Sequence, residues 1–593
     1  MATQSIEKLR GGEFLLTAPE LDSVFIPEDF TEEQTMIGAT TRQFIERDVL
    51  PHVDEIENKN FDVTVALLKK SAELGLLAGS VPEAYGGLGL DTVSSMLVAE
   101  EIARVSSLAV SHGAHTGIGT LPIVYFGTTA QKEKYLPKLA TGELLAAYAL
   151  SESGSGSDAL AARTRADLSA DGREYVLNGE KMWITNGGFA DIFIVFAKVG
   201  GEQFTGFIVE KGFPGVSTGA EEHKMGILGS STRPLLLSNA RVPVENLLGE
   251  IGKGHKIAFN ILNIGRFKLG AACLGGCKYA LIDAARYASE RHQFGKPILS
   301  FGAIQYKLGQ MALLTWVAES MVYRTAGLID TALEGVTDAQ AKLAAIEEYA
   351  IECSIIKVVA SEVLDYVVDE AVQIFGGNGY VRESSVERYY RDARINRIFE
   401  GTNEINRLLV PGMLLRRATK GTLPLMAAIR RIMDEVLEGP TLGATVSDDA
   451  LEAAGAVVAN AKKIALVVAG LAAQTYQDGI QNEQEALCGI SDIIMRVYMM
   501  ESALLRARKL ANRQGAGKAA DPIAYASLYI DQAMGEIEGF ARDVLAGLAE
   551  GDTLRGHLAV LRRFARRDPV NGVPIRRRIA NKIGGNPKWE SVV

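Results

Sequence analysis

The chain has 593 residues, of which 47% are hydrophobic and 23% are charged, and its formal net charge is −10. This length predicts several domains, and this composition is typical of a soluble globular protein. The negative net charge argues against a general nucleic-acid-binding protein, and four cysteines are too few for a disulfide-rich scaffold and suit a reducing compartment.

The first part of the chain has the apolar spacing of helices. Its N-terminus has neither an apolar signal core nor the arginines of a transit peptide, and no charge-free run of 18 apolar residues occurs. We therefore expect a cytoplasmic chain of bacterial type that begins with a helical domain over residues 1–145. The predicted elements of that domain are helices at 35–57, 62–77, 92–126 and 130–139 and a Pro/Gly-rich loop at 81–87.

A change of period marks the middle of the chain. Between residues 145 and 248, strand-length apolar runs alternate with turn signals, and these include buried-strand candidates at 191–198 and 204–210. The dipeptide Asn178-Gly179 is typical of a tight β-hairpin. We expect a middle β-domain over residues 146–252.

Long helical periods return after residue 252 and predict a helical bundle over residues 253–420. A linker-like stretch at 439–448 precedes further amphipathic segments, which predict an additional helical domain over residues 421–593. The predicted fold class is α+β and mainly α, with an N-terminal helical domain, a small middle β-domain, a C-terminal four-helix bundle and an extra C-terminal helical domain. The predicted helices are 256–292, 301–333, 338–375, 402–418, 449–480, 484–512 and 521–550.

The segment 551–588 is basic in an otherwise acidic chain, with ten Arg or Lys residues against two Asp residues. Three interpretations stay open. It forms a solvated face of a packed helix, or it contacts an anionic membrane surface, through an amphipathic stretch that carries Leu561 and Phe564 among arginines, or it binds nucleic acid. We expect no nucleic acid, and a peripheral contact with the inner membrane surface is the second interpretation.

The stretch Arg397–Glu404 reads Arg-Ile-Phe-Glu-Gly-Thr-Asn-Glu and places Glu400 between an apolar pair and a Gly-Thr-Asn step. A carboxylate in apolar surroundings loses hydration, which raises its pKa and makes it a stronger base near neutral pH. The glycine that follows lets a ligand approach the backbone closely. Taken alone, the stretch also fits a plain helix N-terminus with Thr402 or Asn403 as the cap.

Two further segments accompany that motif. Residues 149–158 form a loop rich in small residues and hydroxyls, and residues 373–380 contain Phe-Gly-Gly-Asn-Gly-Tyr and are followed by Glu383, Arg388 and Asp392. Together the three segments resemble the acyl-CoA dehydrogenase family, over about residues 30 to 415. The branch with long acyl chains and a C-terminal extension is most similar, through residues 260–267 and the extra length after 415.

The resemblance implies FAD-dependent α,β-dehydrogenation of a long-chain fatty acyl-CoA to the trans-2-enoyl-CoA, in fatty acid β-oxidation. Glu400 would take the α-proton, and flavin N5 would accept the β-hydrogen as hydride. Some relatives carry the base on an earlier helix, at the place where this chain has Gly265, which leaves Glu400 as the base. The thioester carbonyl would be stabilised by the backbone N–H of Glu400 and a ribityl hydroxyl of FAD.

For the cofactor, no Gly-x-Gly-x-x-Gly follows a predicted strand, so a Rossmann-type site is not indicated. The resemblance implies that Thr185 bonds flavin N5, that Trp183 packs along the ring, and that Arg291 reaches the FAD of a neighbouring subunit, which predicts a homodimer. From its surroundings alone, Trp183 fits a core aromatic as well as a flavin contact. Arg291 alone is better explained as a solvated helix end. The residues implied for FAD are Tyr148, Leu150, Ser151, Gly156, Ser157, Trp183, Ile184, Thr185, Arg291, Gln293, Phe294, Gln373, Gly376, Gly377, Thr402 and Glu404.

For the substrate, the resemblance implies contacts from Ser157, Asn263, Arg266 and Gly401. Arg266 alone would also fit a plain surface arginine. The small side chains of residues 106–117 would line the far end of an acyl tunnel and favour long chains, although Pro122 and Tyr125 could shorten it. We expect no metal, because no further ligands complete a site around Cys273 and Cys277 or around His112 and His115.

Two rival functions remain at this stage. An acyl-CoA oxidase would use the same base but pass electrons to oxygen, whereas the dehydrogenase family normally uses electron-transferring flavoprotein. A flavin-fold binding protein would engage a partner or DNA through the basic C-terminus. The retained Glu400 with a full flavin set argues against the second rival, since a binding protein has no chemical need of them.

Overall fold

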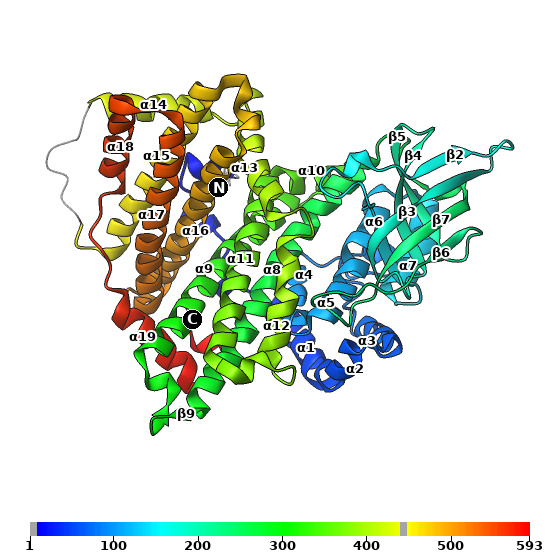
Figure 1. The fold of residues 1–593 in the computed structure, drawn as a ribbon, viewed down its shortest axis with the longest axis horizontal. Helices are drawn as coiled ribbons and strands as arrows, with labels where there is room; N and C mark the ends of the chain where they lie inside the picture. The colour runs from blue at the N-terminus through cyan, green and yellow to red at the C-terminus, as the bar shows by residue number, and fades with distance from the viewer. Residues whose placement is uncertain (1–8, 439–446, 593) are drawn as a thin grey trace, which may run out of the picture.

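The computed structural model describes residues 9–438 and 447–592, so the predicted linker at 439–448 falls largely outside the described residues. Figure 1 shows the β-domain at one end of the molecule, long helices in the middle and a second block of helices at the other end. The predicted fold class, mainly helical with a small β-domain and an extra C-terminal helical part, is confirmed.

The N-terminal helices begin at caps that the sequence supplies. Thr31, Asp91 and Thr128 each accept a hydrogen bond from the backbone N–H three residues later, which satisfies a free donor of the first turn. The predicted helix at 92–126 is broken, because a non-helical step precedes Ser106 and a π-helical stretch occupies Ala114–Gly119. The helices are α1 (Glu32–Phe44), α2 (Val53–Glu57), α3 (Phe61–Glu73), α4 (Thr92–Ile102), α5 (Ser106–Gly113), α6 (Leu121–Phe126) and α7 (Thr129–Ala140).

The middle part is an eight-stranded sheet with the order β6-β7-β3-β2-β4-β5-β8, and β1 pairs in parallel with β4. Successive side chains of β4 point to opposite faces of the sheet, and both faces are buried. Phe193 and Val195 fill the core of the β-domain, while Ile194 and Phe196 join the core of the helices. The strands are β1 (Ala146–Ala149), β2 (Arg165–Leu168), β3 (Glu174–Thr185), β4 (Ile192–Val199), β5 (Gln203–Glu210), β6 (Val216–Thr218), β7 (Thr232–Pro243) and β8 (Leu247–Leu248).

The hairpin predicted at Asn178-Gly179 is wrong, because β3 runs straight through this dipeptide. The register between β3 and β7 shifts there, so the dipeptide forms a bulge rather than a turn. Glycine is required for a steric reason: a Cβ at residue 179 would lie 2.8 Å from Cα of Thr164. The turn between β2 and β3 lies earlier and is closed by a hydrogen bond from the Ser169 N–H to the Glu174 carbonyl.

The central bundle packs α8 against α4, α9 and α11. The helix predicted at 338–375 is divided at Tyr349, whose hydroxyl donates to the carbonyl of Leu9. A short helix, α12, was not predicted. The bundle helices are α8 (Gly254–Glu290), α9 (Gly302–Leu333), α10 (Ala339–Glu348), α11 (Ala350–Phe375), α12 (Ser385–Ala393) and α13 (Asn403–Thr419), and a small hairpin of β9 (His292–Gln293) and β10 (Lys296–Pro297) follows α8.

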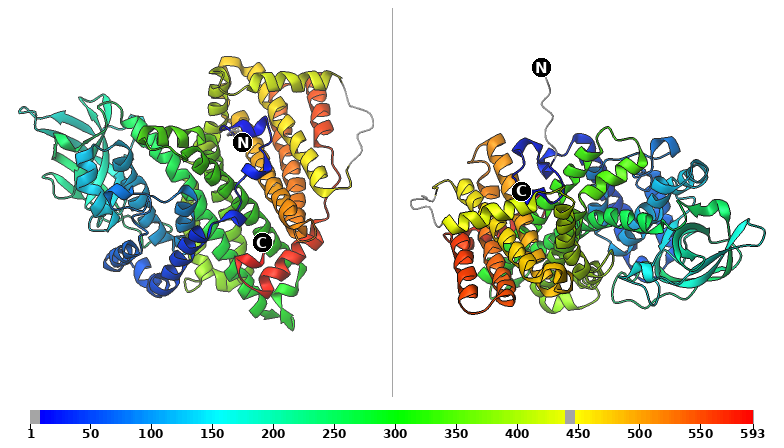
Figure 2. Two further views of the ribbon diagram at one scale, coloured as in Figure 1. Left: turned by 180° about the vertical axis from the view of Figure 1, so that it is seen from behind. Right: turned by 90° about the horizontal axis from the view of Figure 1, so that it is seen from above.

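The C-terminal extension is packed directly on the bundle, as Figures 1 and 2 both show. Arg506, which is fully buried on α16, pairs with Glu319 of α9 at 2.8 Å and with Glu28 of the N-terminal segment at 2.7 Å. Because the buried Arg506 guanidinium cannot be hydrated, it depends on these carboxylates for compensation of its charge. The extension contains α14 (Leu425–Glu438), α15 (Ala450–Tyr476), α16 (Gln484–Gln514), α17 (Ala520–Leu548), α18 (Gly551–Ala565) and α19 (Gly572–Gly585).

The basic segment 551–588 is largely engaged within the extension. Leu561 and Phe564, the apolar residues of its amphipathic stretch, are buried. Arg567 pairs with Asp531, and Arg578 and Lys582 both pair with Asp521. The packed-helix interpretation therefore fits best, and a membrane contact through Leu561 and Phe564 lacks the exposed apolar side chains that it needs.

Two helical segments of the described chain, Gly254–Glu290 and Ala450–Asn482, are long and apolar enough to cross a membrane by length and composition alone. Core helices pass the same test. Both pack against other helices here: α8 against α4, α9 and α11, and α15 against α16 and α17.

Candidate active site

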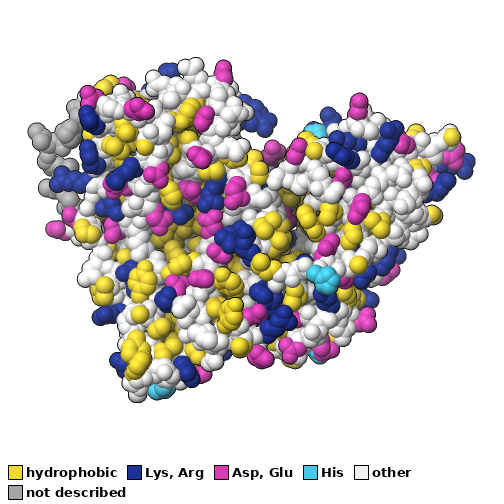
Figure 3. Space-filling view, in the orientation of Figure 1, with side chains coloured by type: hydrophobic (Ala, Val, Ile, Leu, Met, Phe, Trp, Pro, Cys, Tyr) yellow, Lys and Arg dark blue, Asp and Glu magenta, His cyan; other side chains and the backbone are white. Residues whose placement is uncertain are grey.

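A cavity of about 1350 Å³ lies between the β-domain and the bundle, and a narrower one of about 200 Å³ continues from it into the helices. Figure 3 shows the molecular face hollowed between these two parts. The wide cavity is called the cleft below and the narrow one the tunnel. Residues that line both, and so mark their junction, are Val110, Ile118, Thr185, Ile227, Ile395, Phe399 and Glu400.

The backbone around Glu400 is held firmly just before α13. Glu400 has a φ of +57°, a left-handed value that is uncommon for a residue with a side chain. Lys357 and Asn406 both donate to the carbonyl of Gly401, at 2.7 and 2.8 Å. Thr402 caps α13 by accepting from the N–H of Ile405 at 3.3 Å. The helix-cap interpretation is therefore confirmed for Thr402, and it is compatible with the catalytic one, because Glu400 precedes the cap and lines the junction.

The surroundings of Glu400 suit a base. Desolvation raises the pKa of its carboxyl to about 7, while the charges of Arg266 and Lys357 oppose that rise. Its side chain keeps some accessible surface because it faces the cavity rather than bulk solvent, and its buried Oε2 has no hydrogen-bond partner among the described residues. A carboxylate with a free oxygen and a pKa near 7 can remove a proton at neutral pH.

Gly265 on α8 makes room for that carboxylate. A Cβ at residue 265 would lie 2.7 Å from Oε2 and 2.8 Å from Cδ of Glu400, closer than side chains approach one another. Residue 265, the position at which some relatives carry the base, thus lies directly against Glu400. Only one of the two positions can hold a carboxylate in this geometry.

The β-domain supplies a flat aromatic wall. Trp183 sits at a register shift between Lys181 and Ile184, has a φ of +57° and leaves 59% of its surface exposed at the cleft, so it is not a core aromatic. Ile184 is buried behind it, and Thr185 lines the junction. The buried hydroxyl of Tyr148 has no partner among the described residues. A flat wall, hydroxyls and an unpaired buried donor are what the polar edge of a flavin ring requires, so these residues fit FAD.

The loop after β1 is anchored by an ion pair that was not predicted. Lys181 on β3 is buried and lies 2.6 Å from Glu152, which also accepts from the N–H groups of Arg163 and Thr164. The N–H of Met182 donates to the carbonyl of Ser151. These bonds hold the loop against β3, so that Leu150, Ser151, Gly156 and Ser157 line the cleft. The available sequence signal was a lysine at an inward position of an alternating strand.

The predicted substrate residues of α8 also face the cleft. Arg266 is 8% exposed and donates to Oδ1 of Asn263 at 2.9 Å, so it is not a surface arginine. Gly401 and Ser157 line the same cleft. Asn263, Arg266, Ser157 and Gly401 therefore lie around one opening, whereas their roles toward a substrate stay predictions.

A second group of predicted FAD residues lies far from the cleft of the same chain. Arg291, Gln293 and Phe294 are on or beside the exposed β9–β10 hairpin, and Phe294 is 92% exposed. Gln373, Gly376 and Gly377 are exposed at the end of α11, near the end of α8, where Tyr287 stacks on Phe375 at 4.1 Å. Glu404 is exposed and lines neither cavity. One chain thus presents two separate sets, and this set does not meet its own cleft.

The two histidines considered as metal ligands, His112 and His115, contact backbone groups instead. His115 lies 3.0 Å from the Leu139 carbonyl through Nε2 and accepts from the Ala146 N–H, and burial lowers its pKa to about 4. His112 lies 3.2 Å from the Leu76 carbonyl. Within residues 9–438 and 447–592, no group of three His, Cys, Asp or Glu residues is arranged as metal ligands.

Comparison with known proteins agrees with this geometry. Family models described as the acyl-CoA dehydrogenase N-terminal, middle and C-terminal domains match residues 31–143, 147–240 and 252–414, and another acyl-CoA dehydrogenase C-terminal domain model matches 460–563. A probable acyl-CoA dehydrogenase of Bacillus subtilis (strain 168) is 53% identical over 98% of this chain and 99% of its own length.

Two further similar proteins cover different shares of this chain. The mitochondrial very long-chain specific acyl-CoA dehydrogenase of Macaca fascicularis is 45% identical over 66% of this chain and 59% of its own length. The crystal structure of an acyl-CoA dehydrogenase complexed with FAD from Bacillus anthracis has a TM-score of 0.96 and 53% identity, and it covers 98% of this chain and 100% of its own.

Proposed function

Because the chain belongs to the acyl-CoA dehydrogenase family and has FAD as its cofactor, we propose that it dehydrogenates long-chain fatty acyl-CoA, with Glu400 as the base. The observation that carries this proposal is the position of Glu400. Its free carboxyl oxygen faces the junction between a wide cleft and a narrow apolar tunnel. A thioester in the cleft with its acyl chain in the tunnel puts its α-carbon at this junction.

The residues of the chain prepare the proton transfer. Ile395, Phe399 and Ile118 keep the junction apolar, which sustains the raised pKa of Glu400. The α-proton passes to the Glu400 carboxylate. The backbone N–H of Glu400 is proposed to stabilise the negative charge that develops on the thioester oxygen. FAD, when bound, supplies the acceptor for the β-hydrogen and its electron pair.

The length of the tunnel supports a long acyl chain. It follows α8 from Gly265 past Ala272 and Gly276 to Tyr279, about 21 Å at roughly 1.5 Å per residue. An extended alkyl chain advances about 1.25 Å per bond of about 1.5 Å, so roughly 16 bonds fit this distance. Pro122 and Tyr125, which could have shortened the tunnel, are not among its lining residues.

The test is the visible spectrum of the purified holoenzyme during anaerobic addition of palmitoyl-CoA. We expect the flavin band to bleach, and shorter acyl-CoA thioesters to bleach it more slowly or at higher concentration. Glu400→Gln is the matched control and should bind FAD without bleaching. A yellow wild-type protein that bleaches with no acyl-CoA of any length would sink the proposal.

The separate second set of FAD residues supports a homodimer in which each FAD touches two chains. Arg291, Gln293 and Phe294 are exposed and do not line the cleft of their own chain. Their exposed position leaves them available to complete the FAD site of a partner chain. The test uses two inactive variants, Glu400→Gln and Arg291→Glu. Mixed dimers contain one site with both native residues, so mixing after dissociation should restore activity. Continued inactivity of confirmed mixed dimers contradicts the proposal.

Electron-transferring flavoprotein is the proposed electron acceptor, as membership of the family implies. The competing acceptor is oxygen, which would make the protein an acyl-CoA oxidase. Turnover of palmitoyl-CoA in air with a peroxide assay separates the two. We expect slow turnover until electron-transferring flavoprotein is added, whereas one peroxide per enoyl-CoA at full rate would identify an oxidase.

A further inference from the structure

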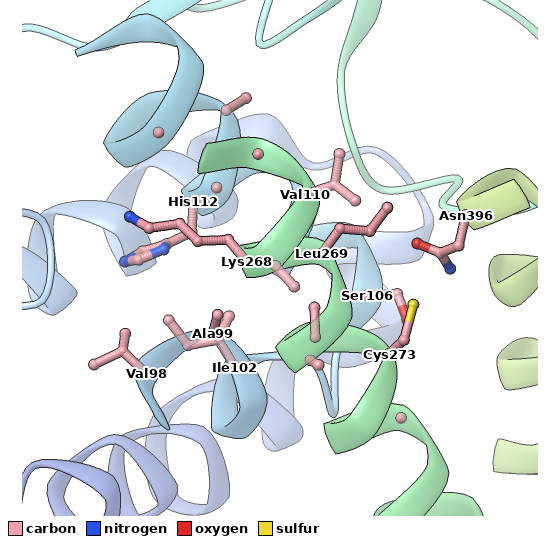
Figure 4. A pocket seen from close by; sticks show the side chains of 18 of the residues that line it. Val98, Ala99, Ile102, Ser106, Val110, His112, Lys268, Leu269, Cys273 and Asn396 are labelled. Atoms are coloured by element: carbon pink, nitrogen blue, oxygen red, sulfur yellow. The ribbon is translucent and has the colours of Figure 1, made fainter. Parts of the chain in front are cut away.

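One charged side chain in the tunnel is not used by the mechanism above. Lys268 lies on α8 one turn after Gly265 and lines the tunnel, and its Nζ donates to Oγ of Ser80 at 3.1 Å. Figure 4 shows its ammonium group on the same side as His112 and away from Cys273 and Asn396. The wall around this corner is otherwise made mainly of apolar or small residues, including Leu76, Gly79, Leu90, Val98 and Ala99.

No carboxylate balances the charge of Lys268 among the described residues. Burial is the one cause that shifts the pKa of its ammonium, and it lowers that pKa to about 8, so the group is mostly protonated at neutral pH. The tunnel wall carries two carboxylates, Glu400 at the junction and Asp392, which accepts from the N–H of Ile227 at 2.5 Å, and neither pairs with Lys268.

The other titratable groups near this corner do not compensate either. His112 has its Nε2 at 3.2 Å from the Leu76 carbonyl, and burial lowers its pKa to about 3, so it is neutral. Arg104, the other cation on the tunnel wall, pairs with Glu46. An ammonium group has three donors, and the hydrogen bond to Ser80 uses one donor of this tunnel-lining group.

A wholly apolar acyl chain leaves this cation with Ser80 but without a counter-charge, and an uncompensated charge in a mainly apolar cavity is costly. A chain that ends in a carboxylate removes that cost through a charge-assisted hydrogen bond. We propose that Lys268 is a specificity residue that receives the distal carboxylate of ω-carboxyacyl-CoA substrates, the thioesters of dicarboxylic acids. This inference rests on the proposed function, and the reaction at Cα and Cβ is the same.

The geometry makes the preference depend on chain length. Lys268 is about 4.5 Å along α8 from Gly265 at roughly 1.5 Å per residue, and its four-carbon stem is flexible. The tunnel continues well beyond it to Tyr279. Dicarboxylic thioesters of intermediate length should therefore place their carboxylate at Nζ, while plain acyl chains of greater length run past it.

The test compares kcat/KM for plain and ω-carboxy thioesters of equal length, in a series from adipoyl-CoA to hexadecanedioyl-CoA, with wild type, Lys268→Met and Lys268→Arg holoenzymes. Methionine keeps the length and removes the charge. We expect Lys268→Met to lower kcat/KM about 10- to 100-fold for the preferred ω-carboxy substrate, as loss of one charge-assisted bond does. Activity with the plain partner should stay equal or rise, and arginine should restore the preference.

A binding measurement gives a readout without turnover. In a Glu400→Gln background, ω-carboxyacyl-CoA should shift the flavin spectrum with a Kd that increases about 10- to 100-fold when Lys268→Met is added. Ser80→Ala, which keeps the cation, is the second variant and should retain the preference. FAD content and Tm of each variant establish that it is folded.

The outcomes separate this inference from the proposed function. A wild-type enzyme that oxidises plain acyl-CoA but discriminates against every ω-carboxy thioester overturns the role of Lys268 alone. Equal effects of Lys268→Met on both substrates of a pair do the same. If the wild type oxidises neither kind of thioester, the proposed function itself has failed.

Discussion

Replacing Gly265 with alanine tests whether free space on α8 sets the position of the base. The added Cβ would lie 2.7 Å from Oε2 and 2.8 Å from Cδ of Glu400. Non-bonded carbon atoms prefer a separation of about 3.5 Å or more, so the carboxylate has to move by roughly 0.7 Å. A misplacement of about 1 Å at a reacting group can cost about 100-fold in rate. We therefore expect kcat for palmitoyl-CoA to fall about 10- to 100-fold.

The assay is anaerobic single-turnover bleaching of the flavin, which isolates the chemical step from product release. FAD content should be unchanged and Tm should not fall, because alanine favours a helix interior. Gly412→Ala in α13 is the matched control, since a Cβ there meets nothing within 4 Å, and its rate should equal that of the wild type. A Gly265→Ala enzyme with the wild-type rate would refute the idea that this glycine positions the base.

Three other variants and the wild-type pH profile have defined outcomes. Because burial raises the pKa of Glu400 to about 7, the contribution of its carboxyl to stability is present below about pH 4.5 and is lost as the pH rises through about 7. The free energy of unfolding of Glu400→Gln should therefore exceed that of the wild type by up to about 3 kcal/mol at pH 8 but not at pH 5. Denaturant unfolding at the two pH values measures this difference. The wild-type bleaching rate should rise with pH through about 7, since only the ionised carboxylate accepts a proton; a flat profile contradicts this. Arg506→Met removes the cation shared by Glu319 and Glu28, while Lys278 still pairs with Glu319 at 2.6 Å. We therefore expect a loss of about 1.5–3 kcal/mol in the free energy of unfolding, the usual value for a charge-assisted hydrogen bond, and no loss would mean that Lys278 alone compensates Glu319. Lys181→Met removes the partner of Glu152, and we expect weaker FAD retention on gel filtration with little loss of sheet signal in circular dichroism.

The sequence predicted most of the cleft because the informative residues lie in short, continuous segments. Glu400, Gly401 and Thr402 adjoin one another, and Trp183, Ile184 and Thr185 follow along one strand. The structure shows all six lining the same cleft. The contacts that hold them were missed because each joins residues distant in sequence: Glu152 to Lys181, and Lys357 to Gly401. No local pattern identifies such a pair.

The wrong predictions of secondary structure arose where tertiary contacts override a local sequence signal. Asn178-Gly179 has the composition of a turn, yet its glycine is needed because Thr164 approaches the backbone there. The apolar period of 338–375 is continuous, but Tyr349 ends one helix and its hydroxyl bonds the N-terminal segment at Leu9. Arg291 and Phe294 could be placed in a hairpin only once the end of α8 was known.

The C-terminal extension is linked to the base by a continuous set of hydrogen bonds. Asp492 of α16 bonds Arg407 of α13 at 3.0 Å, and Arg407 also bonds Glu362 of α11 at 2.7 Å. Glu362 accepts from the side chain of Asn403, whose Oδ1 accepts from Lys357.

Lys357 in turn donates to the carbonyl of Gly401, directly after the base. The left-handed backbone at Glu400 is strained, and strain of this kind persists only where the surrounding contacts determine the conformation. The ion pair between α13 and α16 fixes the helix that begins there, so the extension is part of the scaffold that holds the carboxylate at the junction rather than an appended module.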